Sequence, residues 1–200
     1  MENEKFLEIE EKYRTLIDKA TEIMGKVPDP KHSVSHMESV VRYVKEILEV
    51  EHEVDAEVCI LSAYWHDVGR IEGEKGHAIR SAEMLKEELT KENYDSHFIE
   101  KCYLAIYKHG WNEQPETIEG RIIRDADKID FVGISRWKNC IENNCRFSVI
   151  LDKLPELRKD ILEFGISKEI YDREVAYLIR YLHDYIFNKY GKHSRGKDGV

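Results

Sequence analysis

The chain has 200 residues, of which 42% are hydrophobic and 36% charged, and its formal net charge is −9. This composition is typical of a globular, well-solvated protein and excludes a disordered chain. The acidic balance argues against a nucleic-acid polymer or a membrane as partner, because both need a basic face. A small phosphorylated molecule stays compatible with it, since such a ligand needs only local positive charge.

The same bulk features predict a cytoplasmic protein. No apolar run approaches the roughly 18 residues that span a bilayer, and the acidic, amphipathic N-terminus is unlike a signal peptide. The four cysteines have no CxxC spacing, and three of them lie in apolar helical patterns. Such cysteines are typical of reduced thiols in a protein core.

Helical periodicity accounts for most of the chain. The first predicted helix covers residues 4–25 and ends at Gly25, and the second runs from a cap at Ser33 or Ser35 to about residue 50. Asp55 caps a strongly apolar helix that stops near Gly69. The later predicted helices, in chain order, cover residues 77–90, 95–109, 118–131, 134–144, 155–163 (beginning at Pro155) and 168–189.

No segment predicts a strand, so we expect an all-α fold. The helices fit one compact single-domain bundle over residues 1–190, followed by a polar tail at 191–200. The first and last helices are amphipathic and could pack on a second subunit, which makes a homodimer one expected assembly. The predicted inner face of the last helix consists of Ile170, Val175, Leu178, Ile179, Leu182 and Ile186.

Imidazole and carboxylate side chains recur at spaced positions from three segments. His36 lies in the first turn of its helix, His66 and Asp67 end the most apolar helix, and Asp127 lies on a partly buried one. Buried carboxylates need a cation or donors, and this mixture of ligands suits a divalent metal. We predict these four residues as metal ligands. Asp130, on the same helix face as Asp127, is the nearest competitor for that role.

A His-Asp dipeptide alone carries little weight, because short motifs recur by chance. The chain has a second one, His183-Asp184, in the middle of the last helix and without a partner segment. We interpret that pair as structural. His77 and His109 stay open between a substrate contact, a second metal and an ordinary helix-end histidine.

Basic and aromatic residues near these positions are candidates for substrate contacts. Arg70 and Lys128 adjoin the predicted metal segments and are the best candidates to bind phosphate oxygens, and Arg80 lies close in sequence. Trp111 follows His109 and can either stack on a base or cover the core.

Taken in order, these segments resemble the HD-domain superfamily of metal-dependent phosphohydrolases, whose signature of His, His-Asp and Asp maps to the four predicted ligands. The order HDVGR, GHAIRSAEML, IYKHGW and PETIEGRIIRDADKIDFVGISR is similar to the bacterial and archaeal single-domain branch. The resemblance covers roughly residues 30–140, with the C-terminal helices at 155–190 expected to pack on that core. Two features depart from the family pattern. Lys128 stands where the family more commonly has arginine, and the GYP-type segment of cyclic-dinucleotide phosphodiesterases is absent after His109.

The resemblance implies a metal-activated water that attacks phosphorus. The implied substrate is a small phosphorylated molecule, with a nucleotide as the first choice. The enzyme would be a phosphomonoesterase, a phosphodiesterase or a nucleotide pyrophosphohydrolase. The metal would be Mn, Fe, Zn, Ni, Co or Mg. The residues implied in catalysis are Asp67, His77 and Lys128, and those implied in substrate binding are Arg70, His77, Arg80, His109 and Lys128.

Two alternatives belong to other classes. A di-iron oxygenase of the HD type would hold two metals through six ligands, namely His36, His66, Asp67, His77, His109 and Asp127. A non-catalytic ligand-binding protein would use the same fold without turnover.

Overall fold

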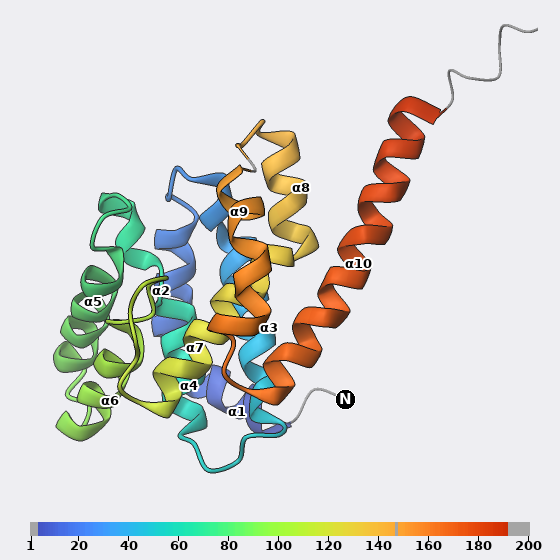
Figure 1. Ribbon diagram of the computed structural model, residues 1–200. Coiled ribbons are helices and arrows are strands. Elements are labelled where there is room, and N and C mark those ends of the chain that lie inside the picture. Colours follow the sequence, from blue (N-terminus) through green and yellow to red (C-terminus); the bar gives the residue numbers. More distant parts are fainter. Residues whose placement is uncertain (1–3, 147, 192–200) are drawn as a thin grey trace, which may run out of the picture.

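The computed structural model describes residues 4–146 and 148–191, and all regular elements in this part of the chain are helical (Figure 1). The predicted all-α fold is therefore confirmed. The helices are α1 (Glu4–Lys12), α2 (Arg14–Met24), α3 (Val34–Leu48), α4 (Ala56–Trp65), α5 (His77–Lys91), α6 (Ser96–Ile106), α7 (Ile118–Ile129), α8 (Ile134–Glu142), α9 (Ser148–Glu156) and α10 (Gly165–Tyr190). Short helical turns join some of them: η1 (Pro30–His32), η2 (Val68–Glu72), η3 (Asp130–Val132) and η4 (Leu157–Ile161).

Helix α4 is the centre of the bundle. It packs against α1, α2, α3, α5, α6 and α7. Its sequence is apolar on every side, which is typical of a helix buried all round, and Cys59, Ile60 and Leu61 are fully buried. The Asp55 carboxylate caps it by accepting a hydrogen bond from the backbone N–H of Val58 at 3.3 Å. The C-terminal end of this rigid helix is where His66 and Asp67 follow.

Helices α3 and α7 pack on α4 and on each other. Both bury an apolar face, which includes Val40 and Val44 on α3 and Ile122 and Ile123 on α7. Helix α7 begins at a cap in which the Thr117 hydroxyl accepts from the backbone N–H of Gly120 at 3.1 Å. The three packed helices therefore bring residues from distant parts of the chain to one region.

The predicted helix at 4–25 is interrupted at Tyr13, which separates α1 from α2. The Tyr13 side chain is buried, its ring stacks on that of Phe98 with 5.7 Å between centroids, and its hydroxyl donates to Glu57 at 2.5 Å. These tertiary contacts outweigh the continuous helical pattern of the local sequence.

The prediction that a helix begins at Pro155 is wrong. Pro155 lies inside the last turn of α9, which begins at Ser148. The chain then continues as the π-helical turn η4, where the backbone N–H of Leu162 donates to the carbonyl of Leu157 at 3.0 Å. A wide turn just after the proline fits the missing N–H of that residue, which weakens the regular helical ladder.

Helix α10 is longer than predicted, and its C-terminal half extends away from the other helices (Figure 1). Ile170 and Leu178 are buried as predicted. Ile179 and Ile186 were expected on the inner face, but they are 64% and 55% exposed, so that part of the prediction is wrong. An amphipathic pattern shows which face of a helix is apolar. It does not show how much of the length of that helix the other helices of the domain cover. The second-subunit contact expected for this helix stays a prediction.

The structure bears on the predictions for the cysteines and for membrane-spanning segments. Cys59, Cys102 and Cys140 are buried free thiols, as the apolar patterns indicated, and Cys145 is a free thiol at intermediate exposure. Over the described ranges, no helix combines the length and the apolar character required for a membrane crossing.

Candidate metal centre and substrate pocket

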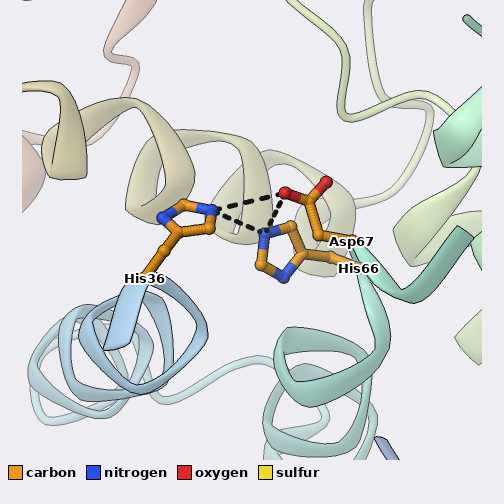
Figure 2. Close-up of side chains that lie close together, drawn as sticks. All are labelled: His36, His66 and Asp67. Carbon is orange, nitrogen blue, oxygen red and sulfur yellow. Dashed lines mark hydrogen bonds and ion pairs between the residues drawn. The ribbon is translucent and has the colours of Figure 1, made fainter. Parts of the chain in front are cut away.

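The predicted ligands His36, His66, Asp67 and Asp127 meet at one buried position (Figure 2 shows the first three). The Nε2 atom of His36 lies 3.2 Å from Nε2 of His66 and 3.5 Å from Oδ2 of Asp67. The same Nε2 lies 3.4 Å from Oδ1 of Asp127. Helix α3, the end of α4 and helix α7 thus supply nitrogen and oxygen atoms that face each other.

Hydrogen bonds at the opposite ring nitrogens hold two of these imidazoles in place. Nδ1 of His66 donates to the carbonyl of Ala63 at 2.7 Å. Nδ1 of His36 lies 2.7 Å from Oδ2 of Asp130. For His66 such a contact leaves Nε2 free as a ligand atom and fixes the ring orientation. The ring of His36 also meets Nη2 of Arg136, which lies 2.8 Å from Nδ1 and 3.4 Å from Nε2. Asp130, which competed with Asp127 for the ligand role, therefore orients His36 in this structure.

Asp67 faces two groups of histidines with its two oxygens. Oδ2 is directed toward His36 and His66, whereas Oδ1 lies 3.2 Å from Nε2 of His77 and 3.6 Å from Nε2 of His109. The rings of His77 and His109 are also anchored through Nδ1, at 2.8 Å to the Glu74 carbonyl and 2.7 Å to the Ile106 carbonyl. His36, His66 and Asp67 form one triad with metal-ligand spacing, and Asp67, His77 and His109 form a second.

The donor set fits divalent metal. Both Asp67 oxygens are buried, and neither accepts a hydrogen bond of good geometry from the described residues, although Arg70 Nε lies 2.7 Å from Oδ2. Buried carboxylate oxygens without a hydrogen bond can take a cation as their partner. Nε2 atoms also face each other in pairs, 3.2 Å apart for His36 and His66 and 3.3 Å apart for His77 and His109. Ring nitrogens that face each other this closely converge on a common point, which suits a bound cation.

The protonation states of His66 and His77 agree with ligand chemistry, whereas the carboxylates of Asp130 and Asp67 outweigh burial and Arg136 and raise the pKa of His36. Burial lowers the pKa of His66 from its usual 6.5 to about 3 and that of His77 to about 4, so both rings are neutral at pH 7. Burial alone would raise the pKa of Asp67, but the neighbouring His66 and Arg70 outweigh it and hold that pKa well below its usual range. The pKa of Asp127 is also well below its usual range, because Lys128 and His36 outweigh the effect of burial.

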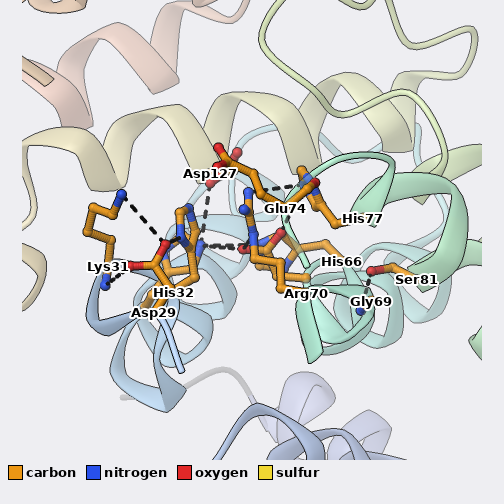
Figure 3. Close-up of polar contacts among 12 residues, drawn as sticks. Asp29, Lys31, His32, His66, Gly69, Arg70, Glu74, His77, Ser81 and Asp127 are labelled. Atoms are coloured by element: carbon orange, nitrogen blue, oxygen red, sulfur yellow. Dashed lines mark hydrogen bonds and ion pairs between the residues drawn. The ribbon is translucent and has the colours of Figure 1, made fainter. Parts of the chain in front are cut away.

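A pocket of about 200 Å³ opens beside the first triad (Figure 3). Three of the residues predicted to bind substrate, Arg70, His77 and Lys128, line it together with Asp127. The ammonium group of Lys128 pairs with the carboxylate of Asp127. His109 is buried behind His77 and does not line the pocket.

Arg80 is not brought to the pocket. Its guanidinium group instead donates to the carbonyls of Gly69 at 3.0 Å, Lys75 at 2.6 Å and Gly73. These bonds tie the connection after η2 to helix α5, so Arg80 holds the loop that precedes His77.

Sequence reasoning missed several pocket residues. His32 is one of them: its Nδ1 lies 2.8 Å from Oδ2 of Asp29 (Figure 3). Its ring meets that of His36 edge-on, with 5.4 Å between centroids. The segment DPKH contained a usable signal, because Asp29 followed by Pro30 is typical of a helical N-terminus. The remaining missed residues of the pocket wall are Lys31, Glu74, Gly110, Phe131, Arg136, Arg146 and Lys153.

Comparison with known proteins gives a match to the HD domain over residues 33–131. No curated protein matches the chain significantly. A predicted HD superfamily hydrolase from an uncultured Thermotogales bacterium has a similar structure, with a TM-score of 0.65, 20% identity, and coverage of 88% of this chain and 91% of that one. YpgQ from Bacillus subtilis in complex with ADP gives a TM-score of 0.65 at 16% identity, covering 96% of this chain and 99% of that one. The Lin1889 protein from Listeria innocua gives 0.60 at 21% identity, covering 86% and 93%. At these identities the structural likeness establishes the fold alone.

Proposed function

Because this chain belongs to the HD-domain superfamily, we propose that it is a metal-dependent phosphohydrolase that acts on a small phosphorylated molecule, with a nucleotide as the first choice. One observation carries the proposal. Ligand atoms of His36, His66, Asp67 and Asp127 converge at one position, and Asp127 also lines a pocket whose wall carries basic side chains.

The four converging residues would hold the metal. A divalent metal there supplies Lewis acidity and makes water a nucleophile at neutral pH. The protein's own groups have separate tasks. Asp130 keeps Nε2 of His36 directed at the centre, and Arg70 and Lys128 keep Asp67 and Asp127 ionised. Arg70 and Lys128 also line the pocket, where they can offset charge on phosphate oxygens.

The coarser part of the proposal, a metal-dependent hydrolase, is supported by the HD domain, by the two triads and by the name of the Thermotogales relative. The nucleotide is supported by two further observations. The YpgQ structure holds ADP, and the pocket of this chain has an aromatic wall. Trp111 and Phe131 form that wall with 5.2 Å between ring centroids, and such a surface can cover a base.

A metal-dependent activity screen tests the proposal. Metal-free protein would be loaded separately with Mn, Fe, Zn, Ni, Co or Mg and given a panel of nucleotides and sugar phosphates, with release of phosphate or pyrophosphate as the readout. We expect turnover with at least one metal and a loss of more than about 100-fold in kcat/KM for Asp67→Ala. Asp184→Ala is the matched control, because it removes the carboxylate of the exposed His-Asp pair on α10. No turnover with any metal, or an Asp67→Ala variant as active as the parent protein, would refute the proposal.

The second triad favours a second candidate function, a di-iron oxygenase. Asp67, His77 and His109 have metal-ligand spacing of their own and share Asp67 with the first triad. Two irons per chain, together with substrate-dependent oxygen consumption and no phosphate release, would support this class over the hydrolase. One or two metals with phosphate release would support the hydrolase.

A further inference from the structure

The pocket beside the metal centre has an excess of positive charge. Its deeper cations are Arg70, Lys128 and Arg136, which we call the floor cations, and its outer ones are Lys31, Arg146 and Lys153, which we call the rim cations. Only Glu74 and Asp127 contribute carboxylates among the described lining residues. This balance is opposite to that of the whole chain, whose net charge is −9.

The floor cations are neutralised within the protein. Arg70 Nε lies 2.7 Å from Asp67 Oδ2, and Arg136 Nε donates to Asp130 Oδ2 at 2.8 Å. Lys128 pairs with Asp127 in the same way. Each of these cations therefore has a carboxylate partner before any ligand enters.

The rim cations lack comparable partners. Within the described part of the chain, Arg146 and Lys153 form no ion pair. Lys31 approaches Asp29 at only 3.6 Å, and Nδ1 of His32 occupies the same carboxylate oxygen at 2.8 Å. The charge on the pocket rim is thus available to a ligand.

Aromatic packing holds the rim close to the floor. Nζ of Lys153 lies 3.9 Å from the ring centroid of Trp111, and Nζ of Lys128 lies 5.8 Å from the same centroid. Burial lowers the pKa of Lys153, although Glu156 opposes this effect, and the charge of Lys128 lowers that pKa further. Like charges held around one indole ring repel each other, and an anion between them would relieve that repulsion.

The rim cations come from outside the region that matches the HD domain, which covers residues 33–131. Lys31 lies on η1 before it, Arg146 follows α8, and Lys153 lies on α9. These flanking segments therefore add a feature to the pocket that the matched domain does not contain.

We propose that Lys31, Arg146 and Lys153 form a second anion subsite, which binds a phosphate group distal to the one at the metal centre. This inference rests on the proposed function and narrows its substrate class to molecules that carry two linked phosphates. The pocket volume of about 200 Å³ is below the roughly 300–1,000 Å³ of sites that enclose a drug-sized ligand. A pair of linked phosphates suits this volume, with the remainder of the molecule against Trp111 or in solvent.

Calorimetric titration with two non-hydrolysable probes tests the subsite. Methylenediphosphonate and methylphosphonate would be titrated into the whole protein in one Mn²⁺-containing buffer. We expect the parent protein to prefer the diphosphonate by about tenfold or more, because the second group gains charge-assisted hydrogen bonds. The double variant Arg146→Gln/Lys153→Gln should lose most of this preference. Lys159→Gln is the control and should keep it, since Lys159 is exposed on η4 and does not line the pocket.

Equal affinity of the parent protein for both probes would overturn the subsite. A double variant that keeps the parent preference, with an unchanged melting temperature, would overturn it as well. The failure of the subsite is distinguishable from that of the proposed function. If the double variant loses the preference for the diphosphonate, and the parent protein turns over no phosphate ester, the subsite is supported and the hydrolase is refuted. Two results together would support the hydrolase and refute the subsite. The parent protein and the double variant would turn over phosphomonoesters at the same rate, and the parent protein would bind both probes with equal affinity.

Discussion

His36 and Asp130 are joined by a 2.7 Å contact between Nδ1 and Oδ2, although they are 94 positions apart in the chain. Arg136 donates to the same Oδ2 at 2.8 Å through its Nε. The carboxylate therefore connects a predicted ligand histidine to a buried cation. Partners of this kind set the ring orientation and basicity of a metal-binding imidazole.

The Asp130→Asn variant should bind metal more weakly. The substitution keeps the size of the side chain but removes the charge that orients His36, and we expect a loss of about 10–100-fold in metal affinity. Metal titration monitored by calorimetry measures this loss. Asp184→Asn on the exposed part of α10 is the control and should bind metal like the parent protein. Unchanged affinity in Asp130→Asn would show that the contact does not support the ligand.

Gly69→Ala should destabilise the fold next to the site. An added Cβ would lie 2.5 Å from the backbone oxygen of His77 and 2.7 Å from the backbone nitrogen of Ser81, and neither atom can move without displacing α5. We expect a loss of about 1–3 kcal/mol in the free energy of unfolding, as is usual for overpacking. Gly165→Ala is the matched control, because no atom lies within 4 Å of its added Cβ. Denaturant unfolding of both variants makes the comparison, and equal stabilities would contradict the close approach.

Acid should destabilise the metal-free protein through His66. The pKa of this residue is lowered from 6.5 to about 3 by burial. Between these two values the unfolded state binds a proton that the folded state does not, so the free energy of unfolding falls as the pH is lowered through this range. At pH 4.5 the effect is about 3 kcal/mol, taking about 1.4 kcal/mol per pH unit. Urea unfolding at several pH values should give a shallower pH dependence for His66→Gln, and an identical dependence would argue against a buried neutral ring.

Removal of His109 should affect one triad and spare the other. His109 is a member of the triad with Asp67 and His77, and it has no place in the triad of His36, His66 and Asp67. If the protein binds two metals, His109→Gln should retain one per chain, because the four predicted ligands of the other metal remain. Elemental analysis of the dialysed protein measures this number. Loss of both metals would show that the two positions are not independent.

Metal should raise the melting temperature of the parent protein by mass action. Binding to the folded state alone adds about 2.7 kcal/mol of stability at a free metal concentration 100 times the Kd. A thermal scan with each divalent ion, followed by a chelator that returns the melting temperature to its starting value, checks this expectation. Asp67→Asn should show a much smaller increase, because both triads contain Asp67.

The helices could be predicted because apolar periodicity is a local signal, whereas the four predicted ligands depended on the order of motifs along the chain. Apolar residues at helical spacing located α3, α4 and α7, and the order His36, His66-Asp67, Asp127 distinguished the site from the second His-Asp pair. His183 and Asp184 of that pair are 75% and 65% exposed on α10, which agrees with the structural interpretation.

Other features depend on tertiary contacts that no local pattern contains. The role of Asp130 follows from its position opposite His36, and Arg80 on α5 is directed to the backbone of Gly69 in η2. The rim cation Lys153 lies on α9, which begins at Ser148 and not, as predicted, at Pro155. Exposure of Ile186 reflects how far the domain extends along α10, which periodicity does not encode.

The distance in sequence between His36 and Asp130 has a consequence for the unfolded chain. A bound ion with its supporting carboxylate would close a loop of nearly half the protein, in the manner of a reversible cross-link. Closing a long loop restricts a disordered chain, and the entropic effect grows slowly with loop length. Metal binding would therefore stabilise α3, α4 and α7 against unfolding together, as one cooperative unit. Amide hydrogen exchange in these three helices should slow together when metal is added, including at positions far from the ligands.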